Sequence, residues 1–517
     1  MPAGERCLKC YNNEKEKGCR RYGSLLLKKE KQEKSMYRDT IAAISTAVSE
    51  SGIGIIRISG ENAVQVADRI YRSKGKRKLL AEAPSHTIHY GYICDGDEVI
   101  DEVLVMLMRG PRSFTAEDTV EINCHGGVYA MKRILETVLK YGARPAEPGE
   151  FTKRAFLNGR IDLSQAEAVI DVIQAKNEYA LRSSVSQLKG AVQQVIEALR
   201  KEIIYHIALI ESALDDPEHI SLDGYPEQLQ QVCGTWMEKL QHLIDSADNG
   251  RMIREGIKTV IVGKPNAGKS SLLNLLTGEE RAIVTDIAGT TRDILTETIQ
   301  MNGLTLNLVD TAGIRSTEDY VEKIGVERAR ENAKDADLVI YVADSSAQLD
   351  ENDDEIMEIL TERPGIILLN KTDLEPVTTE GILRQRFDSV RVKKLSTQDD
   401  RYVDDTSEKQ DTVRIIPVSA RNRTGIGDLE DEVRKMFYQG EISFNDEVYI
   451  TNIRQKNLLI QALEGLKQVK ASIDAQMPED FFSIDLMSVY EALGGITGEQ
   501  VGEDLVNEIF SKFCMGK

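Results

Sequence analysis

Residues 263–271 constrain the fold of this 517-residue chain most, because they form a complete phosphate-binding loop, G-x-x-x-x-G-K-S. The β-branched run at residues 257–262 predicts a buried strand, and a helical pattern begins at Ser271. A glycine turn that matched by chance would not have both flanking elements. In such a loop, backbone N–H groups and the helix N-terminus surround the phosphates, Lys269 reaches their β and γ oxygens, and Ser270 ligates Mg²⁺.

The segment Asn370-Lys371-Thr372-Asp373 indicates which base this domain binds. It follows an apolar run at residues 365–369 that predicts a strand. The carboxylate of Asp373 can accept hydrogen bonds from N1–H and N2–H of guanine, and adenine lacks that pair of donors. Ser419 and Ala420, which follow a strand predicted at residues 413–418, fit the loop that closes over guanine.

A further strand end lies beside the expected metal. Asp310-Thr311-Ala312-Gly313 follows a strand predicted at residues 304–309. Asp310 is expected just outside the ligands of Mg²⁺, and the N–H of Gly313 near the γ-phosphate. Four such elements in chain order, each at a strand end, predict a GTP-binding domain of the α/β P-loop type.

Composition limits the remaining possibilities. A chain of this length suggests about three domains. The net charge of −20, from 65 basic and 85 acidic residues, argues against a protein that coats nucleic acid without specificity, but allows one shaped RNA at a local basic patch. No apolar stretch reaches membrane-spanning length. The scattered cysteines suit a reducing cytoplasm, and Cys7, Cys10 and Cys19 are interpreted as incidental rather than a zinc site.

The N-terminal part of the chain has two sections. Residues 1–35 are rich in Lys and Arg without periodicity, and are expected to be a disordered or non-native extension ahead of Met36. A transit peptide fits less well because of the glutamates. Residues 36–157 mix helix with strands predicted at 53–59, 99–108 and 120–123, and are expected to form an α+β domain.

Helical patterns flank the GTP-binding segment on both sides. The capping box Ser164-x-x-Glu167 is expected to start the first helix, and Thr497-x-x-Gln500 the last one. Each apolar stripe needs a partner to bury it, so one all-α domain is inferred from residues 158–250 and 441–517, with the GTPase inserted at residues 251–440. The stripes are Leu163, Ala166, Ile170 and Ile173; Leu188, Val192, Val195, Leu199, Ile203, Ile207, Ile210 and Leu214; Leu459, Leu463, Leu466, Val469 and Ile473; and Val501, Leu505, Ile509 and Phe513.

With these flanks, the chain resembles the MnmE (TrmE) family of tRNA-modification GTPases along residues 36–517. A generic phosphate loop would not bring such flanks with it. The residues that carry the resemblance, besides the GTPase motifs, are Gly54-Ile55-Ile56-Arg57-Ile58-Ser59-Gly60, Ser113-Phe114-Thr115-Ala116-Glu117-Asp118, Glu121 with His125-Gly126-Gly127, residues 148–159, and the terminal Cys514-Met515-Gly516-Lys517.

The resemblance implies three parts: an α+β N-terminal domain that binds tetrahydrofolate and forms a homodimer, a discontinuous all-α domain, and an inserted Ras-like GTPase domain. It also implies a cytoplasmic, membrane-free protein in a heterotetramer with a flavin-dependent partner of the MnmG (GidA) type, which brings FAD and NADH. Together they would add a (carboxymethyl)aminomethyl group to C5 of the wobble uridine of certain tRNAs.

The resemblance also implies a folate site. The one-carbon donor, 5-formyl- or methylene-tetrahydrofolate, would be bound by Arg57, Glu121, Arg160 and Lys517. Arg57 and a second cation suit the glutamate tail of folate, and Glu121 suits the donors of the pterin ring. Arg160 stands where the family usually has lysine, which keeps the charge but not the shape of the donor. Without the resemblance, Arg57 and Glu121 would be interpreted as an ordinary surface ion pair.

Hydrolysis needs an unusual arrangement here. The position after Gly313, where Ras-like proteins carry a water-orienting glutamine, holds Ile314. By the resemblance, Glu322 positions the attacking water through a bridging water, although the sequence alone favours a solvated charge in an acidic loop. No arginine finger is evident, and the family uses K⁺, bound when two GTPase domains meet. Its ligands would come from Asn266, Thr285, Ile287 and Thr290, while Thr291 joins Ser270 on Mg²⁺.

These motifs define the expected site. Lys269, Glu322 and Cys514 are the candidate catalytic groups, although a lone cysteine near a helix end is most often a small buried side chain. By the resemblance, Cys514 acts in the modification chemistry as nucleophile or proton donor. The expected GTP contacts are Asn266, Ala267, Gly268, Lys269, Ser270, Ser271, Thr285, Asp286, Ile287, Ala288, Gly289, Thr290, Thr291, Asp310, Thr311, Ala312, Gly313, Asn370, Lys371, Asp373, Ser419 and Ala420.

Two alternative functions compete with tRNA modification. A ribosome-assembly GTPase of the same superfamily normally carries a basic RNA-binding domain, and this chain has an acidic helical frame instead. A switch that only recruits partners would not need a folate-like domain or Cys514. The polar stretch at residues 395–412 is expected to be a solvated surface insertion without an assigned role.

Overall fold

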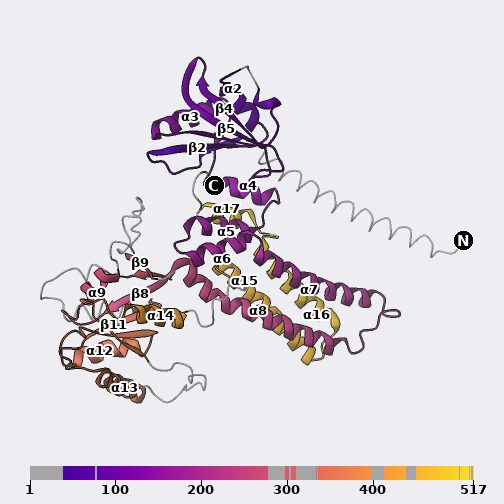
Figure 1. The fold of residues 1–517 in the computed structure, drawn as a ribbon. Helices are drawn as coiled ribbons and strands as arrows, with labels where there is room; N and C mark the ends of the chain where they lie inside the picture. The colour runs from indigo at the N-terminus through magenta and orange to yellow at the C-terminus, as the bar shows by residue number, and fades with distance from the viewer. Residues whose placement is uncertain are drawn as a thin grey trace. The chain divides into compact units, whose positions relative to one another are not determined.

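The computed structural model describes residues 39–75, 79–276, 297–301, 304–309, 333–334, 336–397, 413–437, 450–499, 501–511, 513 and 516. The chain divides into two compact units, whose elements are labelled in Figure 1. One unit comprises Met1–Ile170 with Thr497–Lys517, and the other Asp171–Ile496. The extension expected at residues 1–35 lies outside the described residues.

The first unit is built on a mixed sheet, which in the described residues has seven strands in the order β3-β4-β5-β6-β2-β1-β7. Alternate residues such as Ile56 and Ile58 of β2 are fully buried with helices α2 and α3. The strands predicted at 53–59, 99–108 and 120–123 are confirmed as β2, β5 and β6. The elements are β1 Ile41–Ile44, β2 Ser51–Ser59, α2 Ala63–Ile70, β3 Tyr71–Ser73, η1 Leu80–Glu82, β4 Thr87–Asp95, β5 Glu98–Met108, β6 Thr119–Gly126, α3 Val128–Lys140 and β7 Arg144–Pro145.

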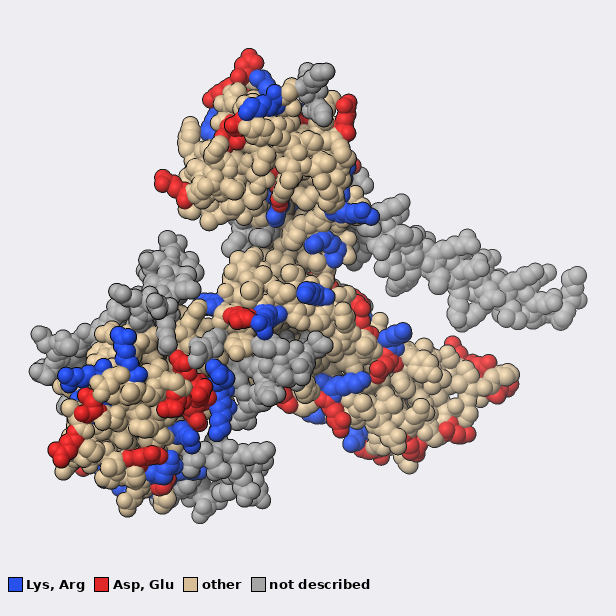
Figure 2. Space-filling model, in the orientation of Figure 1, with Lys and Arg blue, Asp and Glu red and all other residues tan. Residues whose placement is uncertain are grey.

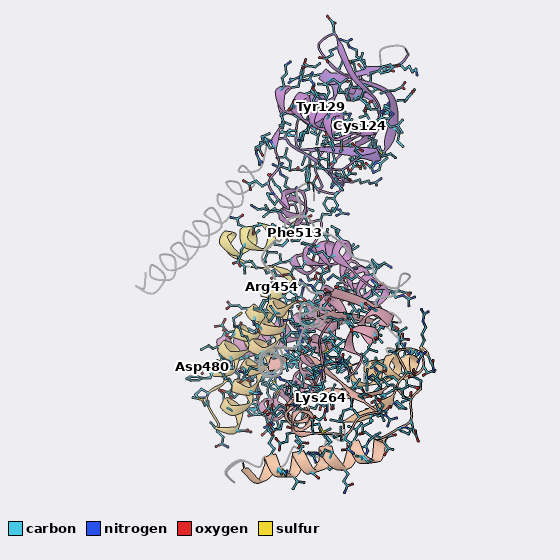
Figure 3. All side chains as sticks on the ribbon, turned by 90° about the vertical axis from the view of Figure 1, so that its left-hand side faces the viewer. Cys124, Tyr129, Lys264, Arg454, Asp480 and Phe513 are labelled. Atoms are coloured by element: carbon cyan, nitrogen blue, oxygen red, sulfur yellow. The ribbon has the colours of Figure 1, made fainter. Side chains whose placement is uncertain are left out.

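C-terminal residues pack on the helix that follows this sheet. Helix α4 (Glu150–Leu157) begins after Gly149, whose φ is +68°. A Cβ at Gly149 would lie 2.5 Å from the carbonyl oxygen of Phe510 on α17 (Glu503–Ser511) and 2.9 Å from the Cβ of Phe513, which Figure 3 labels. Only glycine permits this approach, so the end of the chain belongs to the N-terminal unit by close packing.

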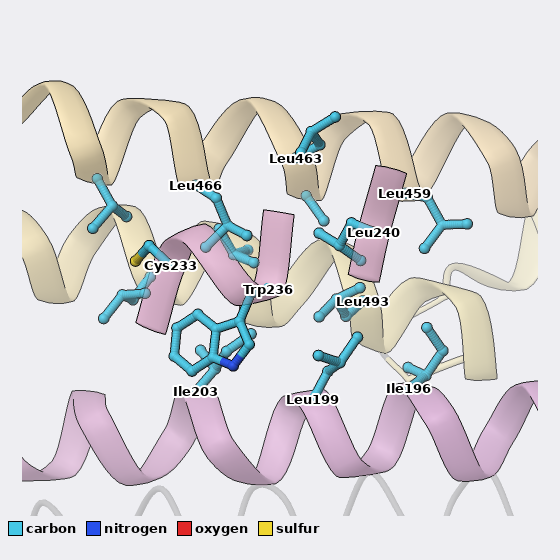
Figure 4. Close-up of a cluster of buried hydrophobic side chains, with 14 of the residues drawn as sticks. Ile196, Leu199, Ile203, Cys233, Trp236, Leu240, Leu459, Leu463, Leu466 and Leu493 are labelled. Carbon is cyan, nitrogen blue, oxygen red and sulfur yellow. The ribbon is translucent and has the colours of Figure 1, made fainter. Parts of the chain in front are cut away.

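The second unit contains a helical bundle whose core draws on both sides of the GTPase segment (Figure 4). Leu199 of α7, Trp236 of α8 and Leu466 of α15 are at most 2% exposed in this core. The stripe predicted at Leu459, Leu463, Leu466, Val469 and Ile473 is confirmed as buried. The helices that follow α4, and those that lead toward α17, are α5 Leu163–Gln174, α6 Glu178–Leu188, α7 Ala191–Asp215, α8 Tyr225–Glu255, α15 Ile453–Asp474 and α16 Glu479–Thr497.

Both predicted capping boxes are wrong. Helix α5 is capped by Asp162, whose carboxylate accepts from the N–H of Gln165 at 2.8 Å, while the Gln165 side chain accepts from the Asp162 N–H at 3.0 Å. Asp162 and Gln165 thus form the reciprocal pair of hydrogen bonds that was predicted for Ser164 and Glu167. The helix therefore begins two residues earlier than predicted, and Ser164 lies inside it. Thr497 ends α16 instead of starting the last helix, α17.

Two predicted stripes also differ from the structure. The pattern at residues 188–214 predicts one helical stretch, but Gly190, with a φ of +89°, separates α6 from α7. In α17, Val506 and Phe510 are buried, whereas the predicted stripe residue Leu505 is 42% exposed. The helix is therefore rotated by one residue, which buries a large aromatic ring in place of a leucine.

The GTPase segment forms a second sheet, with strands in the order β13-β12-β11-β8-β10-β9. The strands predicted at 257–262, 304–309, 365–369 and 413–418 are confirmed, and apolar clusters cover both faces, as is usual for parallel strands. The elements are β8 Ile257–Val262, α9 Lys269–Leu276, β9 Glu297–Met301, β10 Leu304–Leu308, β11 Leu338–Asp344, α12 Glu351–Leu360, β12 Gly365–Asn370, α13 Glu380–Thr397, β13 Arg414–Pro417 and α14 Ile426–Phe437.

Helix α13 continues through Thr397, so the polar stretch predicted as an insertion at residues 395–412 begins inside a helix. Residues 398–412 lie outside the described part of the chain. Among the described residues, no helix is both long enough and apolar enough to cross a membrane.

The bundle core leads to a stability prediction. Leu466→Ala removes a fully buried side chain, so the free energy of unfolding of the bundle should fall by about 2–5 kcal/mol. Trp236, the single tryptophan and 1% exposed, reports on the same core by fluorescence during urea unfolding. On the same helix, Ile460→Ala at a 38% exposed site should change stability by about 0.5 kcal/mol or less. Equal losses in the two variants would contradict the packing described.

Candidate functional site

The phosphate loop between β8 and α9 depends on two glycines. Gly263 has a φ of +152°, and a Cβ there would lie 2.5 Å from the carbonyl oxygen of Val342. Gly268 has a φ of +98°, and a Cβ there would lie 2.2 Å from Nδ2 of Asn370. The loop therefore passes too close to its neighbours for any side chain at either position. Asn266, between them, also has a left-handed φ of +62°.

Lys269 turns its ammonium group back onto this loop. Its Nζ donates to the carbonyl oxygens of Gly263 at 2.6 Å and Lys264 at 2.7 Å. Burial lowers the pKa of Lys269 below its ordinary value, because a charged ammonium loses solvation there. A partly desolvated cation inside a loop with a helix N-terminus is an arrangement that suits the oxygens of a di- or triphosphate.

Asn370 links the phosphate loop to the predicted guanine loop. Its Nδ2 donates to the carbonyl oxygen of Ala267 at 2.9 Å, and its Oδ1 accepts from the N–H of Ala420 at 3.2 Å. Because Asn370 is 2% exposed, these two bonds fix the distance between the phosphate-binding and base-binding parts of the site.

Asp373 is prepared to act as an acceptor. Its Oδ1 accepts from the hydroxyl of Ser419 at 2.7 Å, and this hydrogen bond is the main reason that its pKa lies below the ordinary value. The hydroxyl of Ser419 also accepts from the N–H of Asn422 at 3.1 Å. The carboxylate thus stays ionised at neutral pH, as recognition of two guanine N–H donors requires.

The structure brings together the predicted residues of the phosphate loop, Asn370, Lys371, Asp373, Ser419 and Ala420. Sequence reasoning missed Asp344, whose Oδ2 lies 2.6 Å from Nζ of Lys371. An acidic residue at the end of an apolar strand was the available signal. The predicted site residues that lie outside the described part of the chain are Thr285, Asp286, Ile287, Ala288, Gly289, Thr290, Thr291, Asp310, Thr311, Ala312, Gly313 and Glu322.

A second polar site lies on the sheet of the first unit. Arg57 of β2 and Glu121 of β6 are directly opposite each other, and their Nε and Oε1 atoms are 2.8 Å apart. Their side chains are only 14% and 13% exposed, so this ion pair is partly withdrawn from water rather than fully on the surface. The carbonyl oxygen of Gly516 accepts from Arg57 Nη1 at 3.2 Å and from the hydroxyl of Ser45 at 3.1 Å.

An aromatic ring joins the third predicted folate residue to this site. The guanidinium carbons of Arg57 and Arg160 lie 5.4 Å and 5.1 Å from the ring centre of Phe114. Phe151 is a second aromatic neighbour of Arg57, at 5.5 Å. Two cations, one carboxylate and flat apolar surfaces suit an anionic ligand with a planar, hydrogen-bonding ring. The prediction did not assign the two phenylalanines a role, and Cys514 and Lys517 lie outside the described residues.

The expected Mg²⁺ site at the nucleotide needs few ligands from the protein. The described residues contain no cluster of three or more His, Cys, Asp or Glu side chains that could hold a metal ion. Mg²⁺ bound with a nucleotide needs only one or two protein oxygens besides phosphates and waters, and Ser270 at the start of α9 fits that requirement.

Known proteins match the chain almost from end to end. A family model described as "MnmE helical domain" matches residues 163–514, and one described as "GTP-binding protein TrmE N-terminus" matches residues 40–160. The tRNA modification GTPase MnmE of Lachnoclostridium phytofermentans is 56% identical over 482 residues, which are 93% of this chain and 100% of that protein. Its counterpart in Acetivibrio thermocellus is 47% identical over 485 residues, 93% of this chain and 100% of that protein.

The solved structure of Era from Aquifex aeolicus is 25% identical and covers 40% of this chain and 66% of that chain, with a TM-score of 0.24 that is too low to support an argument about the fold. The full-length relatives decide the assignment. At such identity over so much of its length, the chain belongs to the MnmE family of tRNA modification GTPases, enzymes that hydrolyse GTP.

Proposed function

We propose that this GTPase works with a flavin-dependent partner of the MnmG type to add a (carboxymethyl)aminomethyl group to C5 of the wobble uridine of certain tRNAs. The observation that carries the proposal is the contact of Gly516 with Arg57, the residue that also pairs with Glu121. The end of the chain and a polar, aromatic-walled site thus meet in one unit. A transfer of a one-carbon group that uses both the C-terminal residues and this site would need them to lie close together.

The N-terminal site is proposed to hold a tetrahydrofolate derivative, 5-formyl- or methylene-tetrahydrofolate. Arg57, Arg160 and Lys517 would attract its glutamate carboxylates, and Glu121 would accept from the pterin ring. The partly buried Arg57–Glu121 pair supports this, because a half-desolvated ion pair beside an aromatic ring presents both signs of charge to a ligand. Cys514 would act in the modification itself.

The GTP site is proposed to use the predicted contacts, with Mg²⁺ on Ser270 and Thr291 and the attacking water positioned by Glu322. A K⁺ ion would replace the missing arginine finger, bound by Asn266 and by groups of the loop at Thr285, Ile287 and Thr290. An amide oxygen at Asn266 is a neutral ligand of the kind that a large monovalent cation accepts. Two protomers would bring their GTPase domains together to complete this site.

The assembly is proposed to be a homodimer through residues 36–157 that joins the FAD- and NADH-using partner in a heterotetramer in the cytoplasm. The remaining proposed domains are helical residues 158–250 and 441–517 and the GTPase at 251–440. On the face drawn in Figure 2, basic side chains are interspersed with acidic ones in each unit. Such a surface favours a tRNA held locally and with the partner's help over nonspecific coating.

A base-specificity change follows from Asp373. Asp373→Asn replaces an acceptor of the guanine N1–H and N2–H by an amide that can donate to the 2-oxo group of xanthine, so GTP affinity should fall about 100-fold or more while XTP binding rises. Competition with a fluorescent GDP measures both. Asp388→Asn, at an exposed position on α13, should leave both affinities unchanged. Retained GTP preference in Asp373→Asn would contradict the assignment.

Monovalent cations test the hydrolysis proposal. Turnover of GTP should be slow in Na⁺ and accelerated in K⁺ at equal ionic strength and fixed Mg²⁺, because carbonyl oxygens would replace the hydration shell of K⁺ more readily than that of the smaller Na⁺. Phosphate release measured in the two salts compares the rates directly. Equal turnover in both salts would remove K⁺ from the mechanism.

The modification proposal is tested with the purified flavoprotein partner. Wobble uridines should gain the C5 group in vitro only when folate is supplied, as nucleoside analysis of the tRNA would show. Glu121→Gln should weaken folate binding about tenfold or more and slow modification, with GTP hydrolysis unchanged. Glu136→Gln, at an exposed site on α3, is the matched control. Unaltered C5 modification in a strain that lacks the gene would refute the proposal.

A further inference from the structure

Lys264, which Figure 3 labels, connects the phosphate loop to helix α12, which carries no residue of the predicted site. Its Nζ lies 2.8 Å from Oδ2 of Asp353 and 2.9 Å from Oδ2 of Asp350, at the start of α12. Its own carbonyl oxygen accepts from Nζ of Lys269 at 2.7 Å. One residue thus contacts α12 with its side chain and the essential P-loop lysine with its main chain.

Asp353 is a rigid anchor for this contact. It is 1% exposed, and its Oδ1 accepts from the hydroxyl of the fully buried Tyr341 at 2.6 Å. Its Oδ2 accepts from the N–H of Asp350 at 2.8 Å in the capping box of α12. A carboxylate buried this deeply needs a cation, and Lys264, 21% exposed, supplies it.

The partner Asp350 contributes differently. Its side chain is 54% exposed, so its attraction to Lys264 is screened by water and adds little. Burial of the Lys264 ammonium lowers its pKa, but the hydrogen bonds that it donates to Asp353 and Asp350 outweigh burial and leave the pKa above its ordinary value. The ammonium is therefore charged throughout the physiological pH range. Of the two carboxylates, the buried Asp353 contributes most to holding it.

The other end of the same segment holds the guanine motif. Oδ2 of Asp344 lies 2.6 Å from Nζ of Lys371, and the hydroxyl of Ser345 donates to the carbonyl oxygen of Lys371 at 2.9 Å. The N–H of Ser345 donates to the carbonyl oxygen of Asn370 at 2.9 Å. Residues 344–353, which we name the brace, therefore contact the base motif at one end and the phosphate loop at the other.

We propose that Lys264 is a positioning residue of the GTPase: through Asp353 it holds the phosphate-loop backbone in its binding shape, and the brace couples that shape to the guanine motif. The loop needs such support because Asn266 holds a left-handed φ of +62° that a residue with a side chain rarely adopts, and because Gly263 and Gly268 allow the loop many other conformations. If the loop is already ordered in the folded protein, nucleotide binding does not have to offset the conformational entropy lost in ordering it.

The test is Lys264→Met in the full-length chain, which keeps the length of the side chain and removes its charge. Affinity for GDP and GTP should fall about tenfold, whereas GMP, which lacks the β-phosphate that the loop binds, should change by less than about twofold. Competition with a fluorescent GDP measures all three. Lys264→Arg should restore most of the affinity. Glu355→Gln, at an exposed position on α12 outside the brace, is the matched control and should bind like the unaltered protein.

A substitution at Asp353 tests the same contact from its other side. Asp353→Asn retains an acceptor for Tyr341 but loses the charge, and should reproduce the pattern of Lys264→Met. The double variant should lose little more affinity for GDP and GTP than either single variant, because both substitutions remove the same interaction between Lys264 and Asp353. Unchanged GDP affinity in Lys264→Met, or equal losses for GMP, GDP and GTP, would overturn the proposal, since the latter indicates a general structural role.

Discussion

Burial of apolar stripes from two distant parts of the sequence is the constraint on which the second unit depends. Helices α15 and α16 follow the GTPase segment, α7 and α8 precede it, and all four share one core. The two halves approach closely at Gly250 of α8, where a Cβ would lie 2.1 Å from the carbonyl oxygen of Ile450. Because the chain must return to that point, the GTPase is necessarily an insertion between two halves of a bundle.

The insertion is attached by more than its two peptide connections. Asn307 of β10 donates to the carbonyl oxygen of Glu255 at 2.6 Å, where α8 ends. Asn177 caps α6 and its Nδ2 donates to Thr305 Oγ1, also on β10, at 2.8 Å. Strand β10 leads directly to the predicted Asp310 motif. The bundle therefore bonds to the strand that precedes the predicted Asp310 motif in the sequence.

The sequence predicted elements whose signals are local, and failed where the deciding partner is distant. The phosphate loop, its strand and its helix were correct because glycine spacing and β-branched runs are short-range patterns. The cap predicted for α5 is an exception, because it failed for a local reason: Asp162 and Gln165 satisfy the same rule as the predicted pair. Helix α8 was not predicted, although its buried residues Leu229, Cys233, Trp236, Leu240 and Leu243 recur at helical spacing and were an available signal.

Functional residues follow the same division. Arg57 and Glu121 were predicted as a pair, but whether they form a surface ion pair or a half-buried one depends on strand register, which adjacent residues do not encode. Phe114 and Asp344 gained roles only through contacts with residues far along the chain. Both sites thus rely on ion pairs withdrawn from water, and such pairs cost desolvation that only close geometry offsets. In the proposed function, these pairs would hold ligand-binding atoms in place rather than add stability.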